Sequence, residues 1–172
     1  MSITDYGEAV GAKDYSRAIR ICEEINALTP HSFQGVHFAT WKYIWLLKTD
    51  PAKAKAYAPQ FLALYKRSPL ALQELANAIL GTSISTMVGN IDEKERDYSL
   101  ALALLEAAAK LNDPQDPVLL SALAEASFHT GDRAKAITYQ EAALKFLSTS
   151  TMEIPEERKT KYQQQLDKYK KP

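Results

Sequence analysis

The chain has 172 residues, and 46% of them are hydrophobic, which is enough apolar content to bury the core of one domain or one compact array of repeats. Lys plus Arg and Asp plus Glu each number 21, so the strong basic excess of a nucleic-acid-binding protein is missing. Cys22 is the single cysteine, which excludes an internal disulfide and a cysteine-rich zinc site.

The sequence is compatible with more than one cellular compartment. No apolar run reaches the ~18 residues needed to cross a bilayer, so no membrane insertion is expected. The first residues lack the basic start and apolar stretch of a signal peptide. As given, the chain fits a soluble cytoplasmic protein. An extracytoplasmic location stays open if the chain is a fragment of a larger exported protein.

The first predicted helix is short and weak. It covers Ile3 to Ala12 at most, and Gly7 and Gly11 each disfavour a helix by about 1 kcal/mol. It therefore predicts either a poor cap of a helical array or a chain cut from a larger protein. A longer second helix is predicted in KDYSRAIRICEEINALTP, residues 13–30.

The next pair is predicted in HFATWKYIWLLKTD, residues 37–50, and in residues 50–69. Trp41, Ile44 and Trp45 form the inner stripe of the first of these helices. Trp45 stands where a small residue is usual, so we expect its ring to push the neighbouring helix away. Pro59 predicts a kink or a late start of the second helix.

A third pair is predicted in residues 70–84 and 96–113, separated by the polar segment 87–95, which we expect to be an exposed loop. A fourth follows in residues 116–130, where Asp116 caps and Pro117 suits the first turn, and in residues 131–148. The chain then predicts a terminal helix over 154–171, with Tyr162, Leu166 and Tyr169 on one apolar face.

The second helices of these pairs repeat one another. Counted from Asp14, Asp97 and Asp132, three of them superpose without gaps, and a small residue recurs four positions on, at Ala18, Ala101 and Ala136. A small side chain at a fixed position lets two helices approach closely. Residues 50–69 are a weaker fourth copy, aligned by Pro69 with Pro30, which places Leu64 opposite Ile25 on the packed face.

The segments GDRAKAITYQEAAL and KDYSRAIRICEEINALTP resemble the second helix of a tetratricopeptide repeat. The resemblance implies an all-α fold, a right-handed solenoid of antiparallel helix pairs with about nine helices. It implies one domain over residues 1–172, with pairs at approximately 1–30, 31–69, 70–112 and 114–148 and a capping helix at 154–171. Residues 70–172 are also similar to helical extensions that follow a thioredoxin-like domain in some bacterial redox proteins.

The resemblance to tetratricopeptide repeats implies a non-catalytic protein–protein interaction or scaffolding module that binds a protein or peptide in a concave groove. The alternative is a helical accessory domain that positions or dimerises a thioredoxin-like catalytic part, and a homodimer stays open. In such arrays the first helices line the groove. That rule selects Lys42, Leu46, Gln73, Asn77, Leu80, Ser121, Glu125 and Phe128.

No catalytic, metal or cofactor site is predicted. His31, His37 and His129 are far apart in the sequence and lack a second ligand at the spacing that metal sites use. Cys22 falls on the packed face of its helix and is expected to be a buried structural thiol. Adjacent carboxylates such as Glu23 and Glu24 point in directions about 100° apart, which is wrong for an acid–base pair.

Overall fold

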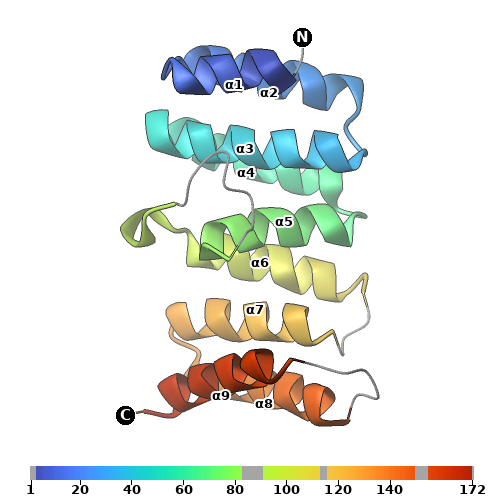
Figure 1. Ribbon diagram of the computed structural model, residues 1–172, viewed down its shortest axis with the longest axis vertical. Coiled ribbons are helices and arrows are strands. Elements are labelled where there is room, and N and C mark those ends of the chain that lie inside the picture. The colour runs from blue at the N-terminus through green and yellow to red at the C-terminus, as the bar shows by residue number, and fades with distance from the viewer. Residues whose placement is uncertain (1–2, 83–90, 113–115, 150–154, 172) are drawn as a thin grey trace. The chain divides into compact units, whose positions relative to one another are not determined.

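The structure, a computed structural model, describes residues 3–82, 91–112, 116–149 and 155–171. These residues form nine α-helices, one short 3-10 helix and no strand, which confirms the predicted all-α class (Figure 1). The elements are α1 (Ile3–Gly11), α2 (Tyr15–Leu28), α3 (Phe33–Thr49), α4 (Pro51–Tyr65), α5 (Pro69–Leu80), η1 (Glu93–Glu95), α6 (Tyr98–Ala109), α7 (Pro117–His129), α8 (Arg133–Thr149) and α9 (Glu156–Lys170).

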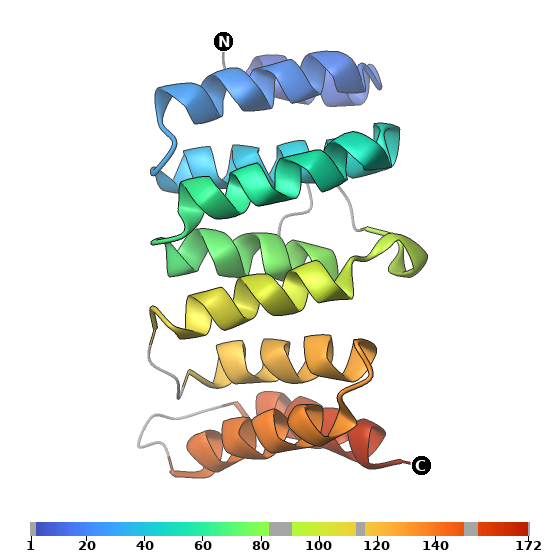
Figure 2. The same ribbon diagram turned by 180° about the vertical axis from the view of Figure 1, so that it is seen from behind.

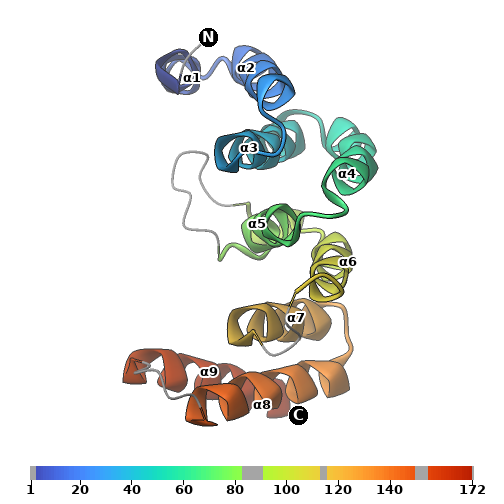
Figure 3. The ribbon, with the colours of Figure 1, turned by 90° about the vertical axis from the view of Figure 1, so that its right-hand side faces the viewer.

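The chain divides into two compact units, residues 1–96 and residues 97–172, called unit 1 and unit 2 below. Within unit 1, helices α1, α3 and α5 form one layer and α2 and α4 form the other (Figure 3). Within unit 2, α7 and α9 lie on one side and α6 and α8 on the other. The boundary falls inside the predicted third pair, residues 70–112, so a single continuous solenoid stays a prediction. Among the described helices, none is long and apolar enough to cross a membrane.

An aspartate cap begins each second helix, which explains the repeat that the sequence shows. The carboxylate of Asp14 accepts a hydrogen bond from the backbone N–H of Arg17 at 2.9 Å, and Asp97 and Asp132 do the same three residues on. In the weaker copy the cap is Asp50, three residues before the expected register position. Helix α4 therefore carries an extra N-terminal turn, and the late start expected from Pro59 is wrong.

Pro59 lies inside α4 without ending it. A proline in a helix leaves the carbonyl four residues earlier without its usual partner. Here both Pro59 and Lys55 are exposed, so water can reach that carbonyl. The packed face of α4 is instead made by Ala54, Tyr57, Ala58, Phe61 and Tyr65. Leu64 was expected on that face, but it is 42% exposed while Ile25 is 8% exposed.

The core of unit 2 follows the predicted stripes. Ala124 and Ala136 are fully buried and pack with Tyr169 of α9. Tyr162 of α9 packs with Leu120, Ala143 and Leu147 in a second cluster. The small residues let α7 and α8 approach closely. The apolar face of α9 packs mainly on α8 and reaches Leu120 and Ala124 of α7. The buried face predicted for the terminal helix is thus confirmed.

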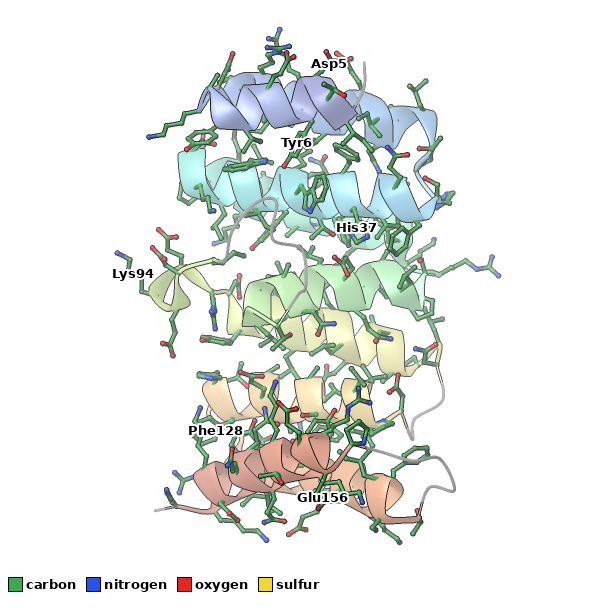
Figure 4. The ribbon with its side chains drawn as sticks, in the orientation of Figure 1. Asp5, Tyr6, His37, Lys94, Phe128 and Glu156 are labelled. Carbon is green, nitrogen blue, oxygen red and sulfur yellow. The ribbon has the colours of Figure 1, made fainter. Side chains whose placement is uncertain are left out.

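Aromatic side chains fill the core between α1 and α3 in unit 1. The indole N–H of Trp45 donates a hydrogen bond to the Tyr6 hydroxyl at 2.8 Å, and Tyr15 stacks on the Trp45 ring at 4.8 Å. The Tyr6 side chain (Figure 4) also stacks on Trp41 at 5.0 Å. Both tryptophans therefore face the first helix pair. The expectation that Trp45 displaces its own partner helix is wrong, because α1 and α2 receive the ring.

Two boundaries of unit 1 differ from the predicted ones. Helix α3 begins at Phe33, four residues early, because the Ser32 hydroxyl caps the N–H of Gly35 at 2.9 Å. Helix α5 ends at Leu80 because Gly81 adopts φ +76°, which favours glycine. Arg96 then binds this helix end, donating to the Leu80 carbonyl at 2.8 Å.

The predicted exposed loop, residues 87–95, lies partly outside the described residues. Its described part is not an open loop throughout, since Ile91 is 1% exposed and residues 93–95 form η1. Arg96 also donates to the Ile91 carbonyl at 3.2 Å, which ties this segment to the end of α5.

Candidate functional site

The structure places the predicted groove residues of α3 on the opposite side of unit 1 from the one expected. Lys42 contacts Glu23 of α2 and Tyr57 of α4, and both belong to the layer of second helices. Leu46 is 7% exposed and lies below the same layer. The physical reason is the rotation of α3, whose Trp41 ring turns toward Tyr6 of α1.

The predicted residues of α5 are only partly available at the surface. Leu80 is 2% exposed and belongs to the core, while Gln73 and Asn77 are half-buried. The backbone carbonyl of Asn77 accepts from the N–H of Thr82 at 2.9 Å, so this residue closes the end of α5.

The predicted residues of α7 belong to unit 2, where α9 lies against them. The Ser121 hydroxyl, 7% exposed, donates to the Gln165 side chain at 3.2 Å. Phe128 packs on Tyr169 with ring centroids 4.8 Å apart, and the Lys168 ammonium lies 5.1 Å from its ring (Figure 4). Burial raises the pKa of Tyr169, and the nearby Glu125 charge adds to that rise. The sequence predicted these three residues as groove lining, but α9 occupies their side of α7.

A groove does exist in unit 1, between α2 and α4. Both helices pack on α3 and make little contact with each other, so α3 forms the floor between them (Figure 2). Two adjoining depressions of about 490 and 360 Å³, which share Glu23, follow this line. We call their lining the α2–α4 groove: Ser16, Ile19, Arg20, Glu23, Asn26, Lys42, Leu46, Thr49, Asp50, Lys53, Tyr57, Gln60, Phe61 and Leu64.

Lys42 holds the walls of the α2–α4 groove in place. Its ammonium lies 2.8 Å from the Glu23 carboxylate on one wall and 4.2 Å from the centre of the Tyr57 ring on the other. The Lys42 side chain is 17% exposed and that of Glu23 is 50% exposed, so water partly screens this ion pair. Burial raises the pKa of the Tyr57 hydroxyl.

A polar clasp closes one end of the α2–α4 groove. The Tyr65 hydroxyl donates to the Pro30 carbonyl at 2.8 Å and lies 2.6 Å from the Asn26 side-chain nitrogen, which donates to it. The same nitrogen donates to the Gly35 carbonyl at 3.0 Å. This clasp joins α4 to the turn between α2 and α3 and fixes the distance between the walls there.

The residues considered for chemistry lie apart from one another in the structure. Cys22 is fully buried, as predicted, and burial raises the pKa of its thiol. The His37 ring lies 3.1 Å from the Glu74 carboxylate, whereas His129 stacks on Tyr98 in unit 2. In the described part of the chain, no cluster of three or more His, Cys, Asp and Glu side chains has the arrangement of a metal site.

Most residues of the α2–α4 groove lie outside the set predicted from the sequence, because that set comes only from the first helix of each pair. A signal was present on the second helices. On α2 and α4, the apolar Ile19 and Leu64 stand beside charged and amide side chains at helical spacing. A helix face packed entirely in a core would carry only apolar residues, so this mixture indicates a face that solvent reaches. The extra turn of α4, which shifts its face, is not visible in the repeat register.

No protein-family model matches the sequence, and the search of curated proteins also found no match. A search of solved structures found the chain similar to one described as "Crystal structure of MamA protein", with 14% identity and a TM-score of 0.48. That similarity covers 97% of this chain and 88% of the other. Neither value is high enough to assign a family or a function. The predicted relation to thioredoxin-like proteins gains no support from these comparisons.

Proposed function

We propose that the chain is a non-catalytic protein-interaction or scaffolding module whose binding surface is the α2–α4 groove of unit 1. The observation that carries the proposal is the open channel between two helices that both rest on α3, where partly exposed Ile19 and Leu64 stand among polar side chains over a buried apolar floor. Grooves of this kind between helices accept the apolar face of a partner segment.

The proposal replaces the surface that the sequence favoured. Leu80 and Ser121 are buried and do not line the α2–α4 groove, whereas Lys42 and Leu46 of the predicted set do line it. Leu64, in contrast, presents 42% of its surface to solvent inside the groove. A pre-formed surface of this kind lowers the entropy cost of binding, because its side chains are already ordered by the floor helix.

Leu64→Glu tests the proposal in an affinity capture from a cell extract, with Leu28→Glu as its matched control. Leu28 is 81% exposed on α2 and does not line the groove. We expect the proteins captured by the unsubstituted chain and by Leu28→Glu to be lost with Leu64→Glu, while all three chains keep similar thermal midpoints. A capture pattern that is the same for both variants would contradict the proposal.

A further inference from the structure

We propose that the occupant of the α2–α4 groove is an amphipathic helix of a partner protein that carries acidic residues beside its apolar face. The inference rests on the proposed function and adds the chemistry of the partner. It follows from the shape of the groove, from the positions of its apolar residues and from a charge on its wall that no described residue neutralises.

The shape of the groove fits one helix. The α2 wall is lined by Ser16, Ile19, Arg20, Glu23 and Asn26, which share one helical face. From the first to the last of these residues the wall is about 15 Å long, or nearly three helical turns. The two walls and the floor are themselves helices, so the bound segment meets ridges on three sides, as a helix packed between others does.

The apolar residues are divided between the two depressions of this channel. Ile19 and Leu46 line one of them, and Leu64 and Phe61 line the other. Leu46 and Phe61 are 7% and 0% exposed, so they are already desolvated, while Leu64 still exposes 42% of its surface. A partner helix gains most by covering Leu64 and Ile19 with its own apolar stripe.

Two ion pairs form among the charged residues that line the groove, and one cation remains outside them. Glu23 pairs with Lys42 at 2.8 Å, and Asp50 pairs with Lys53 at 3.2 Å. The remaining charged residue, Arg20, is exposed and makes no ion pair with any residue that the structure describes. Its guanidinium has five donors suited to a carboxylate, so a partner acid at this position forms a charge-assisted contact.

The wider charge around α4 has the same sign. Residues 51–73 hold Lys53, Lys55, Lys66 and Arg67 and include no Asp or Glu. Lys53 lines the groove but pairs with Asp50, so the cations that remain are Lys55, Lys66 and Arg67, which lie on or just beyond the same helix. Their summed field favours an approaching anion over a cation, and this preference weakens as salt is added.

Two synthetic peptides test the inference directly. Both are amphipathic helices of about 16 residues, long enough to span the groove. Both carry Leu at positions i, i+4, i+7 and i+11, and they differ only in having Glu or Lys beside that stripe. Fluorescence anisotropy at low ionic strength should show that the full chain binds the acidic peptide about tenfold more tightly than the basic one.

Arg20→Glu should reduce that preference to about twofold or less, or reverse it. Arg133→Glu in α8 of unit 2 is the matched control, because it makes the same change of net charge far along the chain from the groove. We expect this control to keep the preference. Leu64→Glu should weaken binding of both peptides at least about tenfold, since it places a carboxylate on the apolar seat.

Equal binding of the two peptides, binding of neither, or a preference that survives Arg20→Glu would overturn the inference. The groove could still be a binding surface in those cases, because capture that depends on Leu64 tests the proposed function separately. Light scattering after size exclusion examines another occupant. A dimer that Leu64→Glu dissociates would show that a second copy fills the groove, which also overturns the acidic partner helix.

Discussion

The two units solve the packing of helix pairs in different ways. Unit 2 buries Ala124, Ala136 and Ala143 in its core, and the apolar face of its last helix packs on residues of α7 and α8. Unit 1 uses aromatic rings and polar contacts, among them Trp45 with Tyr6 and Lys42 with Glu23. In both units, however, two second helices pack on a first helix and make little contact with each other, α2 and α4 on α3 and α6 and α8 on α7. The depressions described in unit 1 follow the line between α2 and α4, and the binding surface is proposed there.

The first prediction concerns how tightly the α2–α3 turn of unit 1 is packed. A Cβ atom on Gly35 would lie 1.9 Å from the Thr29 carbonyl oxygen, and the backbone cannot give way without opening the turn. We expect Gly35→Ala to lower the free energy of unfolding by about 3 kcal/mol, measured by urea denaturation. Gly7→Ala is the control, because a Cβ there meets nothing within 4 Å.

Gly7→Ala should leave stability unchanged or raise it by about 0.5 kcal/mol, since alanine favours a helix. If both variants have the same unfolding midpoint, the close packing between α2 and α3 described above is wrong. A large loss for Gly35→Ala alone supports it.

The second prediction concerns the cover of unit 2. Tyr169 is 1% exposed and contacts Phe128, Ala124 and Ala136, so Tyr169→Ala should cost about 3 kcal/mol. Amide hydrogen exchange should become faster in α8 and α9 and stay unchanged in α1 to α4. Gln164→Ala, on the exposed face of α9, should change neither. Faster exchange in both units would mean that they do not respond independently.

The third and smallest effect is the pH response of the helix caps. The backbone N–H and then the ammonium of Lys53 hydrogen-bond to Asp50 and lower the pKa of its carboxyl below the ordinary 3.8. The backbone N–H of Lys135 lowers the pKa of Asp132 in the same way. A lowered folded-state pKa adds stability that is present above about pH 3.8 and lost as pH falls through the folded value.

We expect an NMR titration to give both carboxyl groups a pKa below that of an aspartate in an unstructured chain. Asp50→Asn and Asp132→Asn should each make unfolding slightly less dependent on pH in that range. A carboxyl of either residue that titrates at or above 3.8 would contradict the cap described for its unit.

The sequence predicted unit 2 better than unit 1 for a physical reason. The stripe of Leu120, Leu123, Ala124 and Ser127 is buried as expected, because small residues at a fixed spacing leave few ways for two helices to pack. In unit 1, the rotation of α3 about its own axis depends on whether Trp41 packs on α4 or on α1. The sequence pattern permits both, and Tyr6, far away in the sequence, decides it.

The position of the candidate site also depends on the rotation of α3. Lys42 was expected on the side of the first helices, but the rotation of α3 directs its ammonium between Glu23 and Tyr57. Neither contact follows from helical periodicity, because each joins separate helices. The repeat register predicts which residues are buried, but it does not predict which helix each buried residue contacts.

The most direct test of the binding surface is a heteronuclear NMR titration of the chain with the acidic peptide. We expect the largest shift changes at the backbone amides of Ile19, Arg20 and Leu64, which line the α2–α4 groove. Those changes should be absent from the Leu64→Glu variant. Shift changes centred on α7 and α9, or on Gln73 and Asn77 of α5, would contradict the α2–α4 groove as the binding surface. They would place that surface on the side formed by the first helices.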